Sequence, residues 1–169
     1  MTARLKFLSG LWKEIPFALL LIAYCGFARA EIVTSCDGRY VAKIGDRHEM
    51  VVLRRGQRVA TMKVDHHIDG GVFSLDDSVL VVFGLPFRVD PRSPQVAHLS
   101  IYFIGKNIRL VEKEMYGGGV YDAAFRKDRK SIVVNSQFGV DVIDVERRQV
   151  HTFDAAHTPK FELQKCEKK

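Results

Sequence analysis

The chain has 169 residues and a formal net charge of +6. That length fits a single domain with a substantial hydrophobic core. Its Lys and Arg residues are scattered with few clusters, which favours an ordinary solvated surface over a nucleic-acid-binding face.

The first thirty residues have the composition of a secretory signal peptide. A basic start is followed by an uncharged, mostly apolar run over 15–27 and by Ala-Arg-Ala at 28–30, which a signal peptidase recognises. We therefore predict cleavage after Ala30, so that residues 1–30 are removed and 31–169 form one periplasmic domain. Loss of four basic residues and one acidic residue lowers the net charge from +6 to +3.

Cys25 leaves two alternatives open for this segment. A lipid anchor needs a small residue before the cysteine, and Tyr24 is bulky. A retained membrane helix needs roughly 20 apolar residues, more than the run over 15–27 provides. Cleavage is the favoured interpretation, and Cys25 is then apolar filler that leaves with the signal peptide.

Two cysteines remain, Cys36 near the mature N-terminus and Cys166 near the other end of the sequence. In an oxidising compartment, one thiol at each end of a small chain indicates a disulfide. Two free thiols are the alternative. There is no C-x-x-C motif, so neither a redox pair nor a thiolate zinc site is indicated, and we expect no metal and no cofactor.

The rest of the chain is a succession of short runs rich in Val, Ile, Phe and Tyr, separated by Gly, Asp and Asn. Such runs predict β-strands, and no segment keeps the apolar spacing of a long amphipathic helix. The sequence therefore predicts an all-β fold. The expected strands are Tyr40–Ile44, Met50–Leu53, Val59–Val64, Val79–Phe83, His98–Ile104, Ile108–Glu112, Val120–Phe125, Ser131–Asn135, Val140–Val145 and Gln149–Phe153.

Three units repeat along these strands. SCDGRYVAKIGD begins at Ser35, SLDDSVLVVFG at Ser74 and RKDRKSIVVNS at Arg126, and each places an aspartate just before a strand. Each unit then continues into further β-type runs. This succession predicts three antiparallel β-meanders, the unit from which a propeller blade is built.

These turns resemble those of WD-repeat and YVTN-type β-propeller blades, which commonly carry Ser-Pro-Asp-Gly before an inner strand. Residues 35–38 match with Cys in place of Pro, 74–77 match less well, and 126–129 keep only the aspartate. The Trp-Asp dipeptide is absent, and Ile143-Asp144 stands where it is expected. The resemblance covers residues 35–153 and implies propeller-blade-like units.

Three blades are fewer than a closed propeller normally uses. The units therefore form either an open fan, which is a partial propeller, or half of a ring made by two chains. We favour the open fan, because cysteines at the two ends of the chain can clamp a monomer.

The spacing of the units points to a binding loop. The turn aspartates are 39 residues apart between the first and second units and 52 apart between the second and third. The excess lies in Gly84–Gln95, which holds three of the five prolines and is thereby restricted before it docks. We predict that it contacts a protein partner, although an inert surface insertion is the alternative. The predicted contact residues are Phe87, Arg88, Asp90 and Arg92, with Tyr116 of the glycine-rich segment 115–120 as a neighbour.

No catalytic motif is found. The sequence has no G-x-S-x-G, no H-E-x-x-H and no phosphate-binding loop. The densest polar group is 65–70, but adjacent histidines on an extended chain point to opposite sides and do not easily share a metal. We expect that the protein is not an enzyme.

These features favour an exported, non-enzymatic protein-binding module. Its size, export, blade-like turns and terminal cysteines resemble periplasmic immunity proteins that inhibit cell-wall amidase effectors of type VI secretion systems. That resemblance implies a loop that enters the effector's active-site cleft. We expect a protein partner, no nucleic acid, no stable membrane anchor and a monomer when free. The alternatives are a scaffold that assembles into a larger propeller and an enzyme built around His66, His67 and Asp69.

Overall fold

The structure is a computed structural model and describes residues 32–89, 92 and 94–166. The predicted signal peptide with Cys25 and Ala30 lies outside the described residues, and so does Asp90. Within the described ranges, no helix combines the length and the apolar character needed to cross a bilayer.

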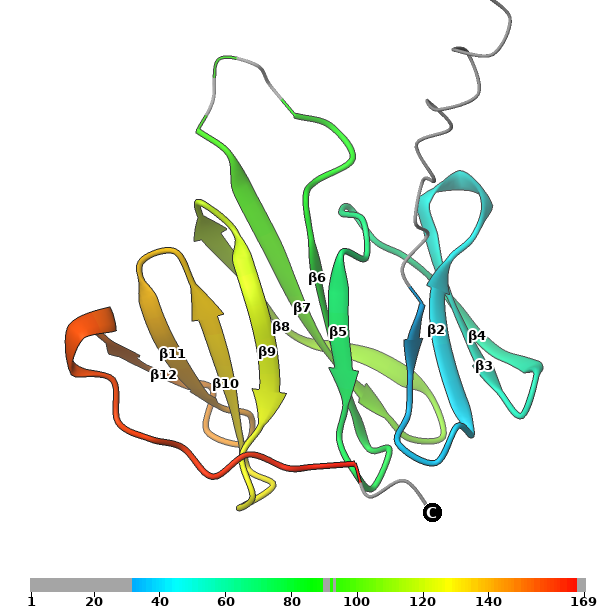
Figure 1. Cartoon of the computed structure of the whole chain (residues 1–169). Coiled ribbons are helices and arrows are strands. Elements are labelled where there is room, and N and C mark those ends of the chain that lie inside the picture. Colours follow the sequence, from blue (N-terminus) through cyan, green and yellow to red (C-terminus); the bar gives the residue numbers. More distant parts are fainter. Residues whose placement is uncertain (1–31, 90–91, 93, 167–169) are drawn as a thin grey trace, which may run out of the picture.

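Three four-stranded antiparallel sheets stand side by side as the blades of an open fan (Figure 1). The predicted all-β fold of three meander units is thereby confirmed. Only two short 3₁₀ turns, at Asp46–His48 and Ala155–His157, interrupt the described strands. Blade one consists of β1 (Val33–Thr34), β2 (Tyr40–Ile44), β3 (Glu49–Arg54) and β4 (Gln57–Lys63); blade two of β5 (Gly70–Phe73), β6 (Val79–Gly84), β7 (Val96–Ile104) and β8 (Ile108–Gly117); and blade three of β9 (Val120–Phe125), β10 (Ser131–Ser136), β11 (Gly139–Asp144) and β12 (Gln149–Phe153).

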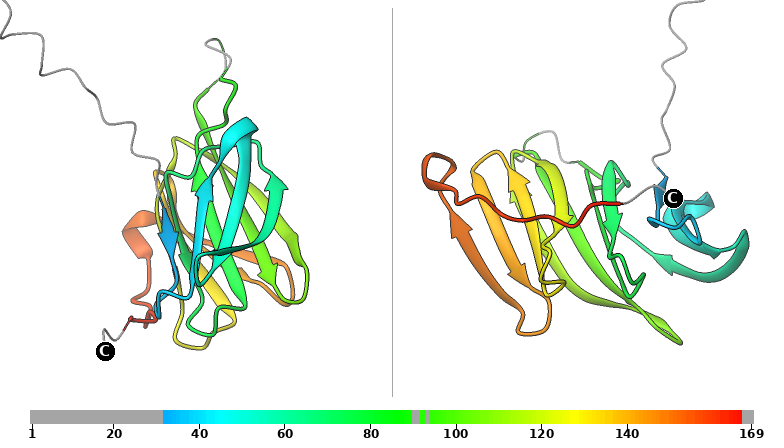
Figure 2. Two further views of the ribbon diagram at one scale, coloured as in Figure 1. Left: turned by 90° about the vertical axis from the view of Figure 1, so that its right-hand side faces the viewer. Right: turned by 60° about the horizontal axis from the view of Figure 1, so that its bottom comes forward.

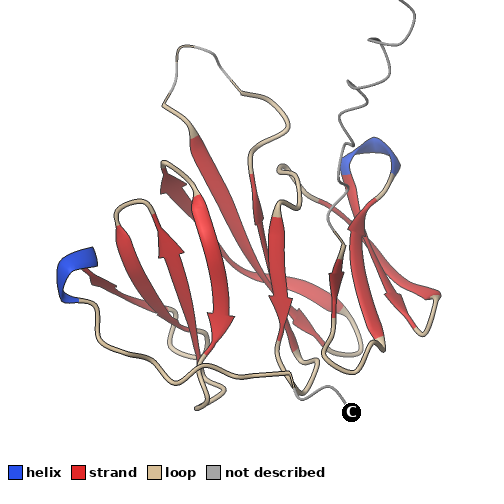
Figure 3. Cartoon of the chain, viewed as in Figure 1, coloured by secondary structure: helices blue, strands red, loops and turns tan. Residues whose placement is uncertain are grey.

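The strands of each blade follow one another in chain order (Figure 3). The first strands of the blades contact each other, β1 with β5 and β5 with β9, and so form the inner edge of the fan. We call the end of the fan that carries the β6–β7 connection the upper end, as in Figure 1, and the opposite end the lower end. The long loop lies at the upper end, and the repeated turns lie at the lower end.

All ten predicted strands form, and two were missed. β1 has two residues and β5 begins with two glycines, so neither carries a β-type run of its own. β8 continues to Gly117, five residues beyond its predicted end, because it pairs with the long β7 up to Val96. Only Gly118 and Gly119 of the glycine-rich segment form the turn to blade three, with φ of 70° and 101°.

The second blade is buried on both faces. Because successive side chains of a strand point to opposite sides, Leu80 and Val82 of β6 pack against blade one, while Val81 and Phe83 pack against blade three. Burying one such side chain contributes roughly 1.5–3 kcal/mol. Burial on both faces explains why β6 is a continuous apolar run instead of an alternating one.

The three repeated turns lie together at the lower end. In each, the aspartate carboxylate accepts a hydrogen bond from the backbone amide two residues later, at 2.9–3.1 Å. The residue after each aspartate has a left-handed backbone, with φ of 59–72°. These aspartates, Asp37, Asp76 and Asp128, are therefore local turn formers, as their position before a strand predicted.

A C-terminal segment, residues 158–166, runs back across the lower end from blade three towards blade one (Figure 2). We call it the strap. It pairs with the end of β9 through the backbone: the Lys127 amide donates to the Glu162 carbonyl and the Gln164 amide donates to the Phe125 carbonyl, each at 2.8 Å. The inner edge of blade three is thus covered at this end.

The strap continues to the other two blades. The Gln164 side-chain oxygen accepts a hydrogen bond from the Leu75 amide at 3.3 Å. Cys166 forms the predicted disulfide with Cys36, and their Cα atoms lie 5.4 Å apart, a normal separation for a disulfide. One segment therefore contacts the repeated turn of every blade.

Removing the disulfide should destabilise the fold strongly. The bond closes a loop over a sequence separation of 130 residues, for which the chain-entropy model gives up to about 5 kcal/mol. The double variant Cys36→Ser/Cys166→Ser should therefore unfold at a lower urea concentration than the oxidised wild type, measured by circular dichroism. The wild type in reducing agent is the matched control and should approach the variant. An unchanged midpoint in the variant would contradict this prediction.

Candidate binding surfaces

The insertion Gly84–Gln95 rises from the upper end of the central blade and extends beyond the neighbouring connections (Figure 1). Its first leg is held by the linker between blades one and two. The His67 amide donates to the Leu85 carbonyl at 2.8 Å, and the Phe87 amide donates to the Asp65 carbonyl at 3.0 Å. The base of the loop is therefore a short ladder.

Two further contacts complete this attachment. The Asp69 carboxylate accepts a hydrogen bond from the Leu85 amide at 2.8 Å. On the second leg, the Gly118 amide donates to the Gln95 carbonyl at 3.1 Å, which ties the loop to the turn between blades two and three. Both legs are thus anchored to backbone or carboxylate groups of neighbouring elements.

The described residues of the tip are exposed. Arg88, Val89 and Arg92 are all exposed, and the exposed fraction of Val89 is 51%. Two of the predicted contact residues, Arg88 and Arg92, therefore lie where a partner can reach them. The sequence prediction did not include Val89, although it is the apolar residue at the tip.

Phe87 is placed differently from the expectation of a free anchor. Its ring stacks on His48 with centroids 4.1 Å apart and meets the edge of His67 at 4.5 Å. Phe87 is half-buried by these rings. It supports the base of the loop, since the contact with His48 connects the loop to blade one.

Tyr116 requires a correction. It was expected in a loop beside the insertion, but it belongs to β8, and its side chain is only 7% exposed. The side chain packs in the core between blades two and three. The expectation was wrong because the glycines that follow Tyr116 made the segment look irregular, whereas pairing with β7 keeps it in the strand.

A buried histidine–serine pair, His66 and Ser100, lies beneath the loop. His66 is fully buried, with Nε2 at 2.9 Å from Ser100 Oγ and Nδ1 at 2.6 Å from the His67 carbonyl oxygen. Ser100 is 2% exposed. A serine and histidine at this distance resemble a catalytic pair, but no substrate reaches a pair that is buried to this degree. Here the two side chains satisfy each other's hydrogen-bonding capacity, and their hydrogen bond attaches the linker between blades one and two to β7.

The neighbouring charged groups also support the loop. Asp65 forms an ion pair with Lys113, and its carboxylate lies 3.2 Å from His98 Nδ1. Partial burial alone would raise the pKa of Asp65, but the interactions with Lys113 and His98 outweigh it, so the pKa of Asp65 is lowered. Asp65 therefore stays ionised at neutral pH and links the inter-blade linker to β7 and β8.

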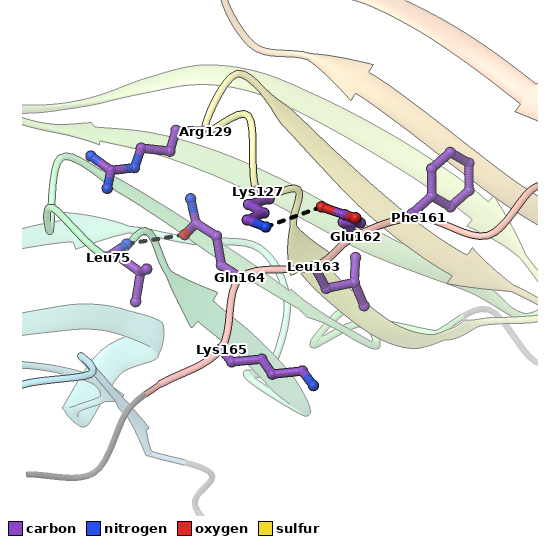
Figure 4. Close-up of a pocket in the computed structure, with 8 residues that line it drawn as sticks. All are labelled: Leu75, Lys127, Arg129, Phe161, Glu162, Leu163, Gln164 and Lys165. Atoms are coloured by element: carbon purple, nitrogen blue, oxygen red, sulfur yellow. Dashed lines mark hydrogen bonds and ion pairs between the residues drawn. The ribbon is translucent and has the colours of Figure 1, made fainter.

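A hollow lies at the lower end, beside the strap (Figure 4). It has a volume of about 600 Å³ and is lined by Leu75, Lys127, Arg129, Phe161, Glu162, Leu163, Gln164 and Lys165. Three of these residues are basic and one is acidic, and Lys127 lies 3.2 Å from Glu162. The hollow can accept an anionic group. The sequence could not reveal it, because its lining comes from three segments that are distant in the sequence: the turns of blades two and three and the strap.

The described residues provide no arrangement of three or more His, Cys, Asp or Glu side chains suited to a metal ion. The polar groups at 65–70 are used instead in the attachment of the loop, as described above.

No family model matches the chain, and no curated protein matches it either. The chain is similar in fold to three larger solved structures. They are a eukaryotic initiation factor (TM-score 0.55, 8% identity, 80% of this chain and 33% of that one), the WD40 repeats of RRP9 (0.53, 14%, 71% and 36%) and hydrazine synthase from Kuenenia stuttgartiensis (0.50, 12%, 68% and 39%).

The fold is propeller-blade-like. At identities of 8–14% the similarity concerns the fold alone. The chain spans between a third and two fifths of the length of these proteins. This partial coverage agrees with an open array of three blades. The similarity in fold confirms the blade resemblance that the repeated turns predicted.

The buried histidine predicts a pH-dependent stability. Burial lowers the pKa of His66 below its ordinary value of 6.5, so the fold favours the neutral ring. The resulting stability is present above about pH 6.5 and is lost as the pH falls through the lower folded-state pKa. The thermal midpoint of the wild type should therefore fall between pH 7 and pH 5.

The variant His66→Gln, which does not titrate, should show a smaller fall over the same range, even if its midpoint is lower at every pH. His151→Gln is the matched control, since His151 is exposed on β12, and it should behave like the wild type. Equal pH dependence in the wild type and in His66→Gln would show that another group is responsible.

Proposed function

We propose that the protein is an exported, non-enzymatic protein-binding module that contacts its partner with the loop Gly84–Gln95. The observation that carries this proposal is the combination of an anchored base and an exposed tip. Both legs of the loop are hydrogen-bonded to neighbouring elements, while Arg88, Val89 and Arg92 are exposed. Loops that are positioned by a rigid scaffold commonly carry binding function.

The energetics of docking favour this loop over the other connections. A loop that is held in one conformation loses little entropy on binding, and the base ladder and the prolines both restrict it. Val89 offers apolar area, and the planar guanidinium groups of the two arginines suit carboxylate or carbonyl groups in a partner. The described residues of the tip therefore fit a partner surface that carries acidic or polar groups.

The partner that fits best is an enzyme with an open active-site cleft. We propose that it is a cell-wall hydrolase delivered into the periplasm, specifically an amidase effector of a type VI secretion system, and that this protein is the matching immunity protein. The support comes from the projecting loop, the disulfide expected of an oxidising compartment and the resemblance in size and blade-like turns described above. Occupation of the cleft by the tip would exclude the substrate.

Assembly into a larger propeller is the second candidate, favoured by the comparison structures, whose chains are two and a half to three times as long as the matched region. Two chains of three blades each would form such a ring. The strap weighs against it, because it ties blade three back to blade one within one chain. A monomeric mass in solution would remove this candidate.

The loop can be tested without disturbing its base. Replacing residues 88–94 by Gly-Asn keeps the ladder formed by Leu85 and Phe87 and the Gln95 contact. The thermal midpoint should therefore change little, while a partner captured by the wild type from envelope extract should no longer be retained. The readout is pull-down with mass spectrometry, followed by inhibition of any hydrolase that is found.

A matched control is the variant Arg55→Ser/Arg58→Ser, which removes two arginines from blade one outside the loop and should bind like the wild type. If the loop replacement keeps full affinity for the captured partner, the loop is inert and the proposal fails. If the partner binds at the loop but is not a hydrolase, only the immunity function fails.

A further inference from the structure

A small pocket lies at the upper end between blades two and three. It has a volume of about 190 Å³, and its lining includes Glu114, Tyr116, Phe138 and Asp141. We call it the interblade pocket. It is smaller than the roughly 300–1,000 Å³ of small-molecule sites, so it has room for one long side chain.

The strand register explains how the pocket acquires its polar groups. Glu114 and Tyr116 are two residues apart on β8 and therefore point to the same side. Glu114 is opposite Leu99, which belongs to the core between blades two and three, and Asp141 of blade three is opposite Val134 of the same core. The two carboxylates thus face each other across the gap between the blades.

This pair of carboxylates has no cationic partner. None of the ion pairs formed by the described residues includes Glu114 or Asp141. Burial raises the pKa of Glu114, and the negative charges of Glu112 and Asp141 raise it further. The negative charges gathered here therefore lower the stability of the fold, and a bound cation would offset this loss.

The hydroxyl of Tyr116 provides an independent indication. It is buried and forms no well-oriented hydrogen bond among the residues that the structure describes, with the Asp141 carboxylate as its near neighbour. A buried polar group without a partner costs about 1–3 kcal/mol. Burial and the nearby Asp141 raise the pKa of Tyr116, so the group remains a neutral hydroxyl. It can accept a hydrogen bond from a donor that enters the pocket.

The rim of the pocket carries an exposed aromatic ring. Phe138 is 71% exposed, the largest value among the exposed large hydrophobic residues. The Phe138 ring lies on Gly117: a Cβ atom there would be 3.0 Å from the ring. The glycine thus allows an aromatic ring to lie close to β8 at the mouth of an acidic pocket.

We propose that the interblade pocket receives an arginine side chain of a protein partner. A guanidinium group has five donors in one plane, which suit two carboxylates and a hydroxyl, and it stacks on aromatic rings such as that of Phe138. A lysine ammonium is a compact point charge and uses neither the plane nor the ring. The second leg of the binding loop is tied to Gly118, close to this pocket. One partner can therefore contact both, and to that extent the inference rests on the proposed function.

The pocket can be tested without any partner. The probe is N-acetyl-arginine amide, with the uncharged N-acetyl-citrulline amide as the control ligand, titrated into the oxidised full domain and followed by amide NMR shifts. The arginine probe should give saturable shifts at residues 114–117 and 138–141 with a dissociation constant on the order of millimolar, and the citrulline probe should give none. Equal shifts with both probes, or shifts elsewhere only, would overturn the proposal.

The matched variants are Glu114→Gln/Asp141→Asn, which neutralises the pocket, and Asp46→Asn/Glu146→Gln, which removes two carboxylates that do not line it. Only the first should lose the arginine-dependent shifts. It should remain folded, with a thermal midpoint at pH 7 equal to or above that of the wild type, because the raised pKa of Glu114 means that its charge opposes folding. If the neutralised variant keeps the arginine-dependent shifts, the proposal is wrong.

A captured partner separates this inference from the proposed function. If the pocket is used, the neutralised variant should bind that partner at least tenfold more weakly, and the matched charge variant should bind like the wild type. Loss of binding on loop replacement together with full binding by the neutralised variant would support the loop and overturn the pocket. Loss in the neutralised variant alone would support the pocket and overturn the loop.

Discussion

The burial of the second blade on both faces is the constraint on which the rest of the structure depends. A sheet that is apolar on both sides must be covered twice, and blades one and three each cover one face. Because β6 has no solvent-facing side, its neighbours are fixed in number and orientation. Blades one and three each contribute an apolar face to one of these two cores.

An open fan is less constrained than a closed propeller, because no further blade among the described residues packs against the outer faces of blades one and three. The strap compensates at the lower end only, where it contacts the repeated turn of each blade and ends in the disulfide. At the upper end the described residues form no covalent link, and the blades are connected there by the stacking of Phe87 on His48 and by the hydrogen bond from Gly118 to Gln95. The connections there, including the long loop and the mouth of the interblade pocket, are consequently the ones available to a partner.

Much of the fold could be predicted from local sequence. Runs such as Tyr40–Ile44 carry their β-character in their own residues, and the aspartate turns are short-range motifs. The predictions failed where distant segments decide the structure. β5 and Tyr116 owe their strand conformation to partners in β6 and β7. Phe87 stays a predicted contact residue, and its half-buried position comes from contacts with His48 and His67, which are distant in sequence. The exposed arginines of the loop tip were predictable because a length irregularity is visible in the sequence itself.

The disulfide has a consequence for the exposed loop Gly84–Gln95. Cys36 and Cys166 close a covalent ring, and Gly84–Gln95 lies inside it. A single cut in the loop would therefore open the ring to a linear chain without releasing either fragment. The two halves would also remain joined by the paired strands β6 and β7 and by the packed faces of the central blade. Nicked protein would therefore migrate as one species in a denaturing gel until the disulfide is reduced, which makes the domain tolerant of a cut in this loop.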